Sequence, residues 1–443
     1  MSITTGTFPG VRIVDMPDLG AISDTSSFVG ERAGSGRFSA LQLRSYVLTD
    51  FLSVKQFGAK GDGATDDTAA FNAALAYVAN KGGGKLWIPD GDYPISGPLT
   101  YAGGFLTLAG DGHGSRLLFS PTTADMFTFA GPDILLTDFN LTTPFATSTN
   151  GTLLKFQDCN NAKINRVWTN GGWQVVEFMG VGYRPTITDC NFVNVMCNGV
   201  FYTNLFGGEA MIANTEMLGA PINVGCGILI HSGDTFAFNN MNIAAFRFGV
   251  LADSQPGGNN SIANIFATNV LCDGAGSADR TTLSDGWCFV SDAPGTFVTR
   301  IHLSSCWGGY MGRFGFNIEN ATDVTLVNCV AIANINHGFL IDLPSQCVTI
   351  DACTATWNSL DNAGVADGIH IAAGVIDFSI TGCRSRPSAV AAGVANTQRY
   401  GIAIEAGISN RYIVVNNQLT GNITGAFADG GTGGSKIVTP NML

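Results

Sequence analysis

The chain of 443 residues is predicted to fold as an all-β protein, a single parallel β-helix in which short strands stack coil upon coil. Its composition favours this class, because glycine is abundant at 57 residues and charged residues make up only 13%, about half the usual share. With 45% of its residues hydrophobic, the chain is neither disordered nor a coiled coil. Two sequence marks that repeat in step from about residue 110 to 430 predict the architecture.

The first mark is a glycine followed by a short apolar strand. It recurs at intervals of 22 to 37 residues. Its members are Gly172, Gly199, Gly227, Gly249, Gly286, Gly315, Gly338, Gly368 and Gly401. A minimum period near 22 residues suits a coil of about three short strands, which buries its apolar face only against neighbouring coils.

The second mark is a cysteine three residues after an apolar residue. It occurs at Cys190, Cys306, Cys329, Cys353 and Cys383, and Asn240 and Asn417 are assigned the same place. In four coils the following glycine lies nine residues later. We therefore interpret the cysteines as an inward or corner stack and expect them to be reduced and mostly buried.

Residues 1–50 differ in composition from the residues that follow them. Residues 1–50 carry many charges among Gly, Ser and Pro, so they are predicted to form an arm or adaptor. The clearest helix is expected over residues 66–79, with polar capping residues before it and Gly82–Gly84 after it. The absence of a basic and apolar leader predicts synthesis in the cytoplasm without a signal peptide.

Two partner classes are not expected. No apolar run approaches the ~18 residues of a membrane span, so no membrane insertion is predicted. The net charge of −12 argues against nucleic acid as a partner.

The run VKQFGAKGDGATDDTAAFNAALAYV (residues 54–78), followed by GGGKLWIPDGDYPIS, resembles the opening of the pectate-lyase-like superfamily of right-handed β-helices. Residues 16–47 are similar to the N-terminal arms of phage and prophage tail proteins, and residues 416–441 resemble the last coils of tailspikes. The resemblance implies a right-handed β-helix over residues 51–443, with the predicted helix capping its first coil. It also implies a homotrimeric virion protein, attached to the phage tail or baseplate through residues 1–50. Such a protein acts extracellularly on bacterial capsular polysaccharide or exopolysaccharide.

Loop lengths predict where a substrate groove would lie. The corners before Gly315 and Gly338 are short and lie between coils with longer corners, so these two coils are predicted to form its floor. Residues 273–285 would form one wall, and residues 354–367 and 384–400 the other, because insertions in repeats tend to fall on one face.

Carboxylates recur four residues past the glycine, at an outward position of the strand, and include Glu319, Asp342 and Glu405. Because coils are spaced by about 4.8 Å, the carboxyls of Glu319 and Asp342 are expected roughly 5 Å apart. A retaining glycosidase has this separation, with one carboxylate attacking and the other carrying the proton. A row of solvated corner carboxylates or a calcium site remains the alternative.

A second polar column precedes the glycines and includes Asp285, Phe314, His337 and Asp367. The strands NHGFLI and ADGIHI are similar to the polygalacturonase pattern. That resemblance implies Asp367 as an acid and His337 as its helper, whereas turn residues are the alternative. The paired Asp-Asp of that family is missing, so pectin hydrolysis itself is not expected.

Further residues near this floor are candidates for substrate binding. Exposed aromatic rings can stack on sugars, although most aromatic rings belong to cores, and arginines can meet an acidic polymer. The candidates are Asp285, Trp307, Arg313, Phe314, Trp357 and Arg399. No metal site and no cofactor are expected, except that calcium would suit a lyase.

The sequence therefore predicts a phage tailspike that binds and depolymerises a bacterial polysaccharide, with hydrolysis as the preferred reaction. One alternative is a polysaccharide lyase, in which His337 with Asp367 provides the base and arginine or calcium neutralises a uronate. Another is a tail fibre that binds a receptor without enzymatic activity. Esterase chemistry through Ser232 or Ser284 is less well supported, because neither serine has the nucleophile-elbow spacing.

Overall fold

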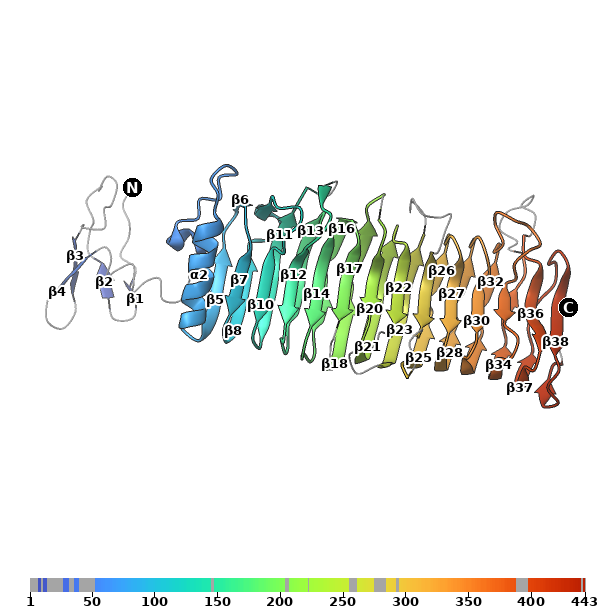
Figure 1. Ribbon diagram of the computed structural model, residues 1–443. Helices are drawn as coiled ribbons and strands as arrows, with labels where there is room; N and C mark the ends of the chain where they lie inside the picture. The colour runs from blue at the N-terminus through green and yellow to red at the C-terminus, as the bar shows by residue number, and fades with distance from the viewer. Residues whose placement is uncertain are drawn as a thin grey trace.

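The computed structural model describes residues 52–442, apart from 145–146, 204–206, 222, 255–260, 275–283, 292–294, 388–396 and 440, and the backbone of four short strands nearer the N-terminus. These four pair in chain order as an antiparallel sheet of β1 (Thr7–Phe8), β2 (Val11–Ile13), β3 (Ser27–Glu31) and β4 (Gly36–Ser39). The remainder is a right-handed parallel β-helix, seen as a continuous stack of coils in Figure 1. The predicted fold class is confirmed.

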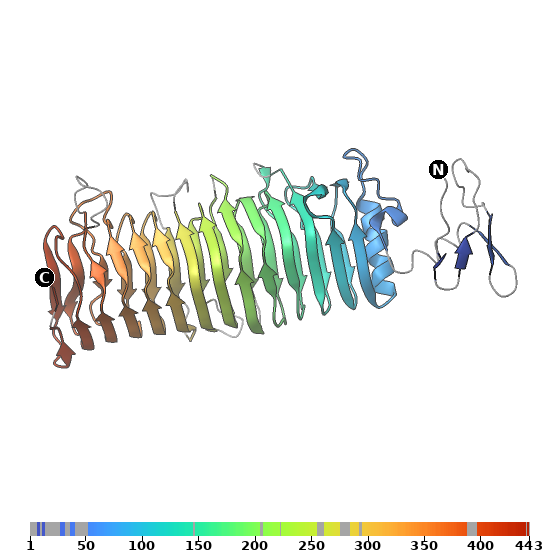
Figure 2. The same cartoon turned by 180° about the vertical axis from the view of Figure 1, so that it is seen from behind.

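One parallel sheet, called the long sheet below, contains thirteen strands from successive coils, as far as the chain is described. Its strands are β7 (Leu99–Ala102), β10 (Phe127–Ala130), β12 (Thr152–Gln157), β14 (Gln174–Met179), β17 (Asn198–Thr203), β20 (Cys226–Ile230), β22 (Phe248–Asp253), β24 (Asp285–Val290), β27 (Phe314–Glu319), β30 (Phe339–Asp342), β33 (Ile369–Ile371), β36 (Tyr400–Gly407) and β38 (Gly425–Gly431). Figure 2 shows the same stack from behind.

The other two sides of each coil are formed by a second set of parallel strands. The side that follows the long sheet contains β5 (Gly83–Ile88), β8 (Phe105–Gly110), β11 (Ile134–Thr142), β13 (Lys163–Asn170), β15 (Thr186–Thr188), β18 (Gly208–Ala213), β21 (Gly233–Ala244), β23 (Ser261–Asp273), β25 (Phe297–Ser304), β28 (Ala321–Val327), β31 (Gln346–Asp351), β34 (Ile376–Thr381), β37 (Asn410–Val415) and β39 (Lys436–Ile437). The third side contains β6 (Gly91–Ile95), β9 (Ser115–Phe119), β16 (Asn191–Val195), β19 (Glu216–Gly219), β26 (Trp307–Gly309), β29 (Val330–Ile332), β32 (Thr354–Thr356) and β35 (Arg384–Ser385). The long strands β11, β13, β21 and β23 run across both sides.

The helix α2 (Thr68–Asn80) packs against β5 and β7 at the first coils (Figure 1). Asp66, just before the N-cap residue Asp67, accepts the backbone N–H of Thr68 at 3.0 Å, and the Asp67 carboxylate accepts two backbone N–H groups of the preceding loop. The helix therefore begins two residues later than predicted, since both acids lie before its first turn. Its buried face consists of Phe71, Ala74, Leu75 and Val78. Two 3-10 helices, η1 (Val54–Phe57) and η2 (Gly112–Gly114), complete the helical elements of the described chain. None of the described helices is both long and apolar enough to span a membrane.

The glycine mark has a steric cause. A Cβ on Gly286 would lie 2.6 Å from the carbonyl oxygen of Gly315, and one on Gly338 would lie 2.6 Å from that of Gly368. Such approaches exclude any side chain, so each glycine lets the backbone of the next coil come close. Gly172 does not belong to this column, because Gln174 pairs with Asn198 and Gly199 therefore lies beside Val175.

The cysteine mark forms a column on the third side of the coils. The pairings of Trp307, Val330, Thr354 and Arg384 place the preceding cysteines, 306, 329, 353 and 383, on consecutive rungs. Asn417 continues the column, but Asn240 does not, because its neighbour Met241 occupies that place. Asn240 instead adopts the left-handed backbone of the adjacent corner, with φ of 52°.

All eleven cysteines are free, and nine of them are buried. Cys347 is exposed and Cys197 is half-buried. The prediction of reduced, mostly buried cysteines is confirmed, and burial raises the pKa of the Cys190 thiol to about 12. These thiols therefore act as small apolar packing groups.

A ladder of buried amides supports the corner that leads into the long sheet. The Asn358 side chain donates to the side-chain oxygen of Gln398 at 2.9 Å and accepts from the side-chain amide of Asn334 at 2.8 Å. It also donates to the Ala331 carbonyl at 3.2 Å. Because Asn358 is completely buried, each of these partners would lose a bond that water cannot replace.

Replacing Asn358 by alanine is therefore expected to lower the free energy of unfolding by several kcal/mol, at about 1–3 kcal/mol for each buried group left without a partner. Urea unfolding followed by tryptophan fluorescence would measure the change. Asn242→Ala is a matched control, because Asn242 is exposed and its side-chain amide donates to the exposed Glu216 at 3.3 Å. Equal stability of the two variants would contradict the ladder's role.

Candidate active site

The outer face of the long sheet carries the carboxylates that the sequence placed four residues past the glycines. Glu319 at the end of β27 and Asp342 at the end of β30 are register partners on neighbouring rungs, and both are half-buried. Asp342 accepts the backbone N–H of Leu343 at 2.7 Å. Glu319 interacts electrostatically with Arg313. The two residues thus lie on adjacent rungs, as expected.

A third carboxylate leans toward this pair from β36. Glu405 accepts the backbone N–H of Ala373 at 3.2 Å, and its other oxygen lies 3.2 Å from Nε2 of His370. Both partners belong to the coil of β33, which lies between β30 and β36. Ala372, the residue of that coil in the same column, is too small to block the lean. Glu405 stays accessible, with its side chain 51% exposed.

Asp367 is held in a buried clamp. Arg399 on the next coil donates from Nε to Oδ1 at 2.9 Å and from Nη2 to Oδ2 at 2.7 Å. The backbone N–H of Tyr400 adds a third bond at 3.1 Å. Burial alone would raise the pKa of Asp367, but the bonds from His370 and Arg399 outweigh it and lower that pKa. Asp367 is therefore an ionised carboxylate that is completely buried.

The same clamp occurs three strands earlier in the long sheet. Asp285 is completely buried, receives Nε and Nη2 of Arg313, and accepts the backbone N–H of Phe314 at 3.2 Å. In both clamps the guanidinium lies over the following aromatic ring, at 4.8 Å for Phe314 and 5.3 Å for Tyr400. The repetition indicates that the clamp itself is a structural unit, in which a long side chain from one rung fastens the corner of the preceding rung.

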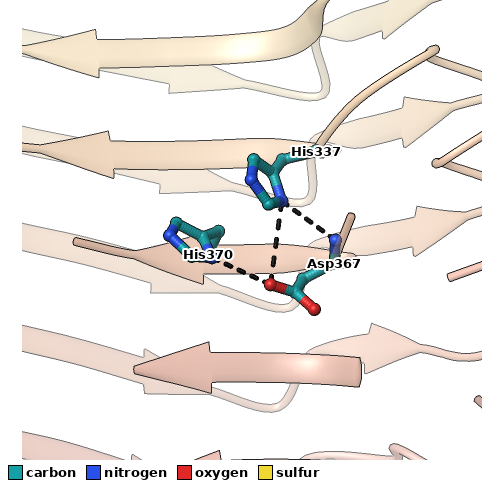
Figure 3. A group of neighbouring side chains, drawn as sticks. All are labelled: His337, Asp367 and His370. Atoms are coloured by element: carbon teal, nitrogen blue, oxygen red, sulfur yellow. Dashed lines mark hydrogen bonds and ion pairs between the residues drawn. The ribbon is translucent and has the colours of Figure 1, made fainter. Parts of the chain in front are cut away.

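What differs between the two clamps is the group beside the aspartate. At Asp285 the neighbours are Asn317, which donates at 3.3 Å, and Cys288. At Asp367 they are His370, whose Nδ1 lies 2.8 Å from the carboxylate, and His337 (Figure 3). Among the described residues, an amide and a thiol thus adjoin the first aspartate, and two imidazole rings adjoin the second.

His337 meets Asp367 through the backbone as well as the side chain. Its Nδ1 accepts the backbone N–H of Asp367 at 2.9 Å and lies 3.8 Å from the carboxylate (Figure 3). Burial and the neighbouring His370 lower the pKa of His337 to about 3, so the ring is neutral near pH 7. It stacks between Phe314 and His370, with centroid distances of 5.8 and 4.2 Å. The two residues predicted to lie on neighbouring coils are thus in contact.

His370 joins two columns that the sequence analysis treated as separate. One ring nitrogen faces the buried Asp367 and the other faces the exposed Glu405. His370 lies two residues past Gly368, so strand alternation already placed it on the same face as the carboxylate column. That position within the strand ADGIHI was the available signal, and it was not used.

His337, Asp367 and His370 bring three possible ligand atoms within 4.8 Å of one another. Their lone pairs are largely engaged, because Nδ1 of His337 accepts a backbone N–H and the Asp367 oxygens accept Arg399. A guanidinium bound to the same carboxylate also opposes a cation. The arrangement suits proton handling better than metal binding.

The two predicted tryptophans lie away from this cluster. Trp307 is on β26, outside the long sheet, with its ring 6.0 Å from that of Tyr310 and its carbonyl accepting Nε1 of Trp287. Trp357 follows β32 in left-handed backbone, with φ of 56°. Both are half-buried. The role of each in substrate binding stays a prediction.

The predicted walls are only partly visible. Residues 275–283 of the segment 273–285 and residues 388–396 of the segment 384–400 lie outside the described residues. Residues 354–367 are described, and they lead from β32 to the clamped Asp367.

The serines considered for esterase chemistry are both buried. Oγ of Ser284 accepts the backbone N–H of Gly312 at 2.6 Å, which fixes it to the corner beside the first clamp. Burial of both, and the bond of Ser284, match packing rather than nucleophilic attack.

The stacked parallel coils define the class of right-handed parallel β-helix proteins. Residues 51–276, just over half of the chain, match the family described as rhamnogalacturonase A/epimerase, pectate lyase-like. The chain belongs to this family.

Shorter similarities reach curated enzymes of Azotobacter vinelandii. Mannuronan C5-epimerase AlgE3 is 48% identical over 56 residues, which are 13% of this chain and 3% of that enzyme. Alginate lyase 7 is 53% identical over 45 residues, or 10% of this chain and 5% of that enzyme. The chain thus matches only a small part of the length of these relatives.

Solved structures share the fold over most of the chain. Bacteriophage phi29 gene product 12, in its pre-mature form, has a TM-score of 0.67 at 14% identity, covering 85% of this chain and 53% of that one. The tailspike of E. coli bacteriophage HK620, in complex with a hexasaccharide, has 0.56 at 13%, covering 91% and 82%. The A-module of the Azotobacter vinelandii epimerase AlgE4 has 0.51 at 15%, covering 88% and 100%. At such identities the likeness establishes the fold alone.

The buried clamp predicts an acid-sensitive contribution to stability. Because the pKa of Asp367 is lowered in the folded protein, its contribution is present above the unfolded pKa of about 3.9 and is lost as pH falls below it. Asp367→Asn is expected to lower the free energy of unfolding at pH 7 by about 1–3 kcal/mol, since the partly exposed guanidinium of Arg399 loses its charged hydrogen-bond acceptor. Urea unfolding at pH 7 and pH 3 would measure both effects.

Asp377→Asn is the matched control. Asp377 makes the same two-pronged pair with Arg411, with both bonds at 2.6 Å, but on the exposed surface. Little change is expected there, because solvent screens exposed pairs. A loss at Asp377 as large as that at Asp367 would refute the distinction between clamp and surface pair.

Proposed function

We propose that this protein is a phage tailspike that binds a bacterial surface or extracellular polysaccharide and cleaves it by glycosidic hydrolysis on the outer face of the long sheet. The observation that carries the proposal is the in-register pair Glu319 and Asp342, with Glu405 leaning toward it from the next coil but one. A polysaccharide is a long ligand, and a face on which each rung repeats the position of the last suits it.

The pair can act on a glycosidic bond in the manner of a retaining glycosidase. Carboxyls on rungs about 4.8 Å apart come close to the ~5–5.5 Å such enzymes use. One carboxylate attacks the anomeric carbon, and the other stabilises or protonates the departing group. The reaction needs no cofactor, in keeping with a cluster whose lone pairs are already engaged.

Several observations support the tailspike assignment. Residues 16–47 and 416–441 resemble tail proteins, and the fold is shared with a tailspike solved with a hexasaccharide. On this proposal the protein is a homotrimer bound to the phage tail or baseplate through residues 1–50. It is made in the host cytoplasm and acts extracellularly on capsular polysaccharide or exopolysaccharide.

A polysaccharide lyase is the second candidate, favoured by Arg399. This guanidinium is 35% exposed and lies beside His370 and Glu405, so a positive group and a possible base are neighbours. The curated relatives named as an alginate lyase and mannuronan epimerases add support. A lyase leaves an unsaturated sugar that absorbs in the near ultraviolet, whereas a hydrolase releases only a new reducing end.

Glu319→Gln and Asp342→Asn are each expected to lower depolymerase activity about 100-fold or more while leaving the fold intact, because both side chains are half-buried on the outer face. Activity would be followed by mass spectrometry of fragments from a panel of bacterial capsular polysaccharides, polygalacturonate and alginate.

Glu209→Gln serves as the control. Glu209 is an exposed acid on β18, outside the long sheet, and it pairs with Arg184. Near-native activity in both test variants would place the chemistry elsewhere. Fragments that all carry an unsaturated end would replace hydrolysis by elimination. Binding of a polysaccharide from the panel with no fragment from any of them would favour a non-enzymatic receptor-binding fibre.

A further inference from the structure

We propose that Glu405 is the general acid of this site, and that His370, oriented by the buried Asp367, is the positioning residue that shares its proton. This inference rests on the proposed hydrolysis, and it assigns roles within the carboxylate row that the pairing of Glu319 with Asp342 leaves open. It concerns a hydrogen-bonded chain of three groups that runs from the interior to the surface.

The chain has a defined direction. Asp367 is completely buried, the His370 side chain is 7% exposed, and the Glu405 side chain is 51% exposed. The contacts are 2.8 Å from Asp367 to Nδ1 of His370 and 3.2 Å from Nε2 of His370 to Glu405. The outer end is thus a carboxyl group that a polymer can reach, and the inner end is fixed by the clamp.

The clamp decides where the protons lie. Asp367 accepts from Arg399 and Tyr400 and is ionised, so it takes the Nδ1–H of His370 as an acceptor. Nε2 of His370 then faces Glu405 with one proton between them. That proton can sit on the ring, leaving a carboxylate, or on Glu405, leaving a neutral ring and a carboxylic acid. A carboxyl group with this partner can give up a proton and recover it without waiting for solvent.

The other charged groups around this chain are consistent with the role. His337 stacks on His370 and is neutral, because burial lowers its pKa to about 3. Arg399 balances Asp367 through their two bonds. Among the described groups, the remaining charged group that faces His370 is therefore Glu405. Its interaction with Arg399 is weaker than that of Asp367 with Arg399.

Geometry separates Glu405 from Glu319 as the proton donor. Asp342 stands between them in the column, and Glu319 interacts electrostatically with the guanidinium of Arg313. Glu405 interacts electrostatically with Arg399 in a similar way, but an imidazole nitrogen of His370 also lies 3.2 Å from its carboxyl group. We therefore assign charge stabilisation to Glu319, nucleophilic attack to Asp342 and proton donation to Glu405.

The reaction balances with these roles. Asp342 attacks the anomeric carbon, the bond from that carbon to the glycosidic oxygen breaks, and the oxygen takes the proton of Glu405. The intermediate is a sugar ester of Asp342. A water molecule, giving its proton to Glu405, then displaces Asp342, so the sugar gains a hydroxyl group and Glu405 is an acid again.

The first test needs no substrate. In full-length protein labelled with 15N-histidine, nuclear magnetic resonance follows the rings of the five histidines against pH. In Glu405→Gln, the pH at which His370 takes up its second proton is expected to fall by half a unit or more, since that proton loses a carboxylate acceptor. Glu209→Gln should leave it unchanged. An identical His370 titration in native protein and Glu405→Gln would overturn the proton-sharing chain.

The second test uses a polysaccharide of the panel that the native protein cleaves. Glu405→Gln is expected to lower kcat at least 100-fold with KM within about threefold, as for a lost acid. His370→Gln keeps a donor toward Glu405 but cannot exchange its proton, so kcat should fall about tenfold and the alkaline limb of the pH–rate profile should move. A merely structural His370 would lower kcat without moving that limb, which would refute its role.

Failures of the two proposals are distinguishable. If Glu405→Gln keeps near-native activity while Asp342→Asn loses it, the acid role of Glu405 is wrong and hydrolysis on the row stands. If the native protein produces only unsaturated fragments, the proposed hydrolysis is wrong and the acid role falls with it. The titration of His370 still decides whether the proton is shared.

Discussion

The in-register stacking of coils is the constraint on which the rest of this structure depends. Parallel strands about 4.8 Å apart turn each position of the coil into a column, so a residue's chemical neighbours are the residues at the same place one coil away. The glycine column shows how strict the spacing is, because a single Cβ at Gly286 or Gly338 would meet the carbonyl of the next glycine. The same spacing brings amides, thiols and carboxylates together in rows.

Much of the fold could be predicted because the repeated glycines and cysteines of the sequence occupy equivalent positions in successive coils. The glycines from Gly199 onward are held by close backbone approach, and the cysteines from Cys306 by interior packing. The errors have physical causes. Gly172 and Asn240 match the local pattern but lie out of register, since a coil can gain or lose a residue at a corner without changing the strands around it.

The site was predictable only in part, for a reason that lies in side-chain length. Columns such as Glu319 with Asp342 follow from strand register, which the sequence marks provide. The clamp between Asp367 and Arg399 does not, because an arginine reaches across a rung from a position two residues before its own glycine. His370 was missed for the complementary reason. One polar column precedes the glycine and the other lies four residues past it, and the ring of His370, midway between them, contacts both.

The arginine clamps explain how a thin β-helix tolerates buried charge beside its face. An ion pair out of water is costly unless its remaining lone pairs and N–H groups are engaged. Asp285 and Asp367 meet this condition in the same way, each with two bonds from a guanidinium and one from the backbone.

Since the aspartate–arginine clamp is the same at Asp285 and Asp367, the residues around each aspartate can differ in chemistry while the backbone of the corner stays the same. Asn317 and Cys288 make the first clamp inert to proton exchange near pH 7, because burial raises the pKa of the Cys288 thiol. His370 makes the second clamp the inner end of a path for protons that emerges at Glu405. The same clamp thus recurs at two corners, and in the described part of the chain the second corner alone is linked through an imidazole to an exposed carboxyl group.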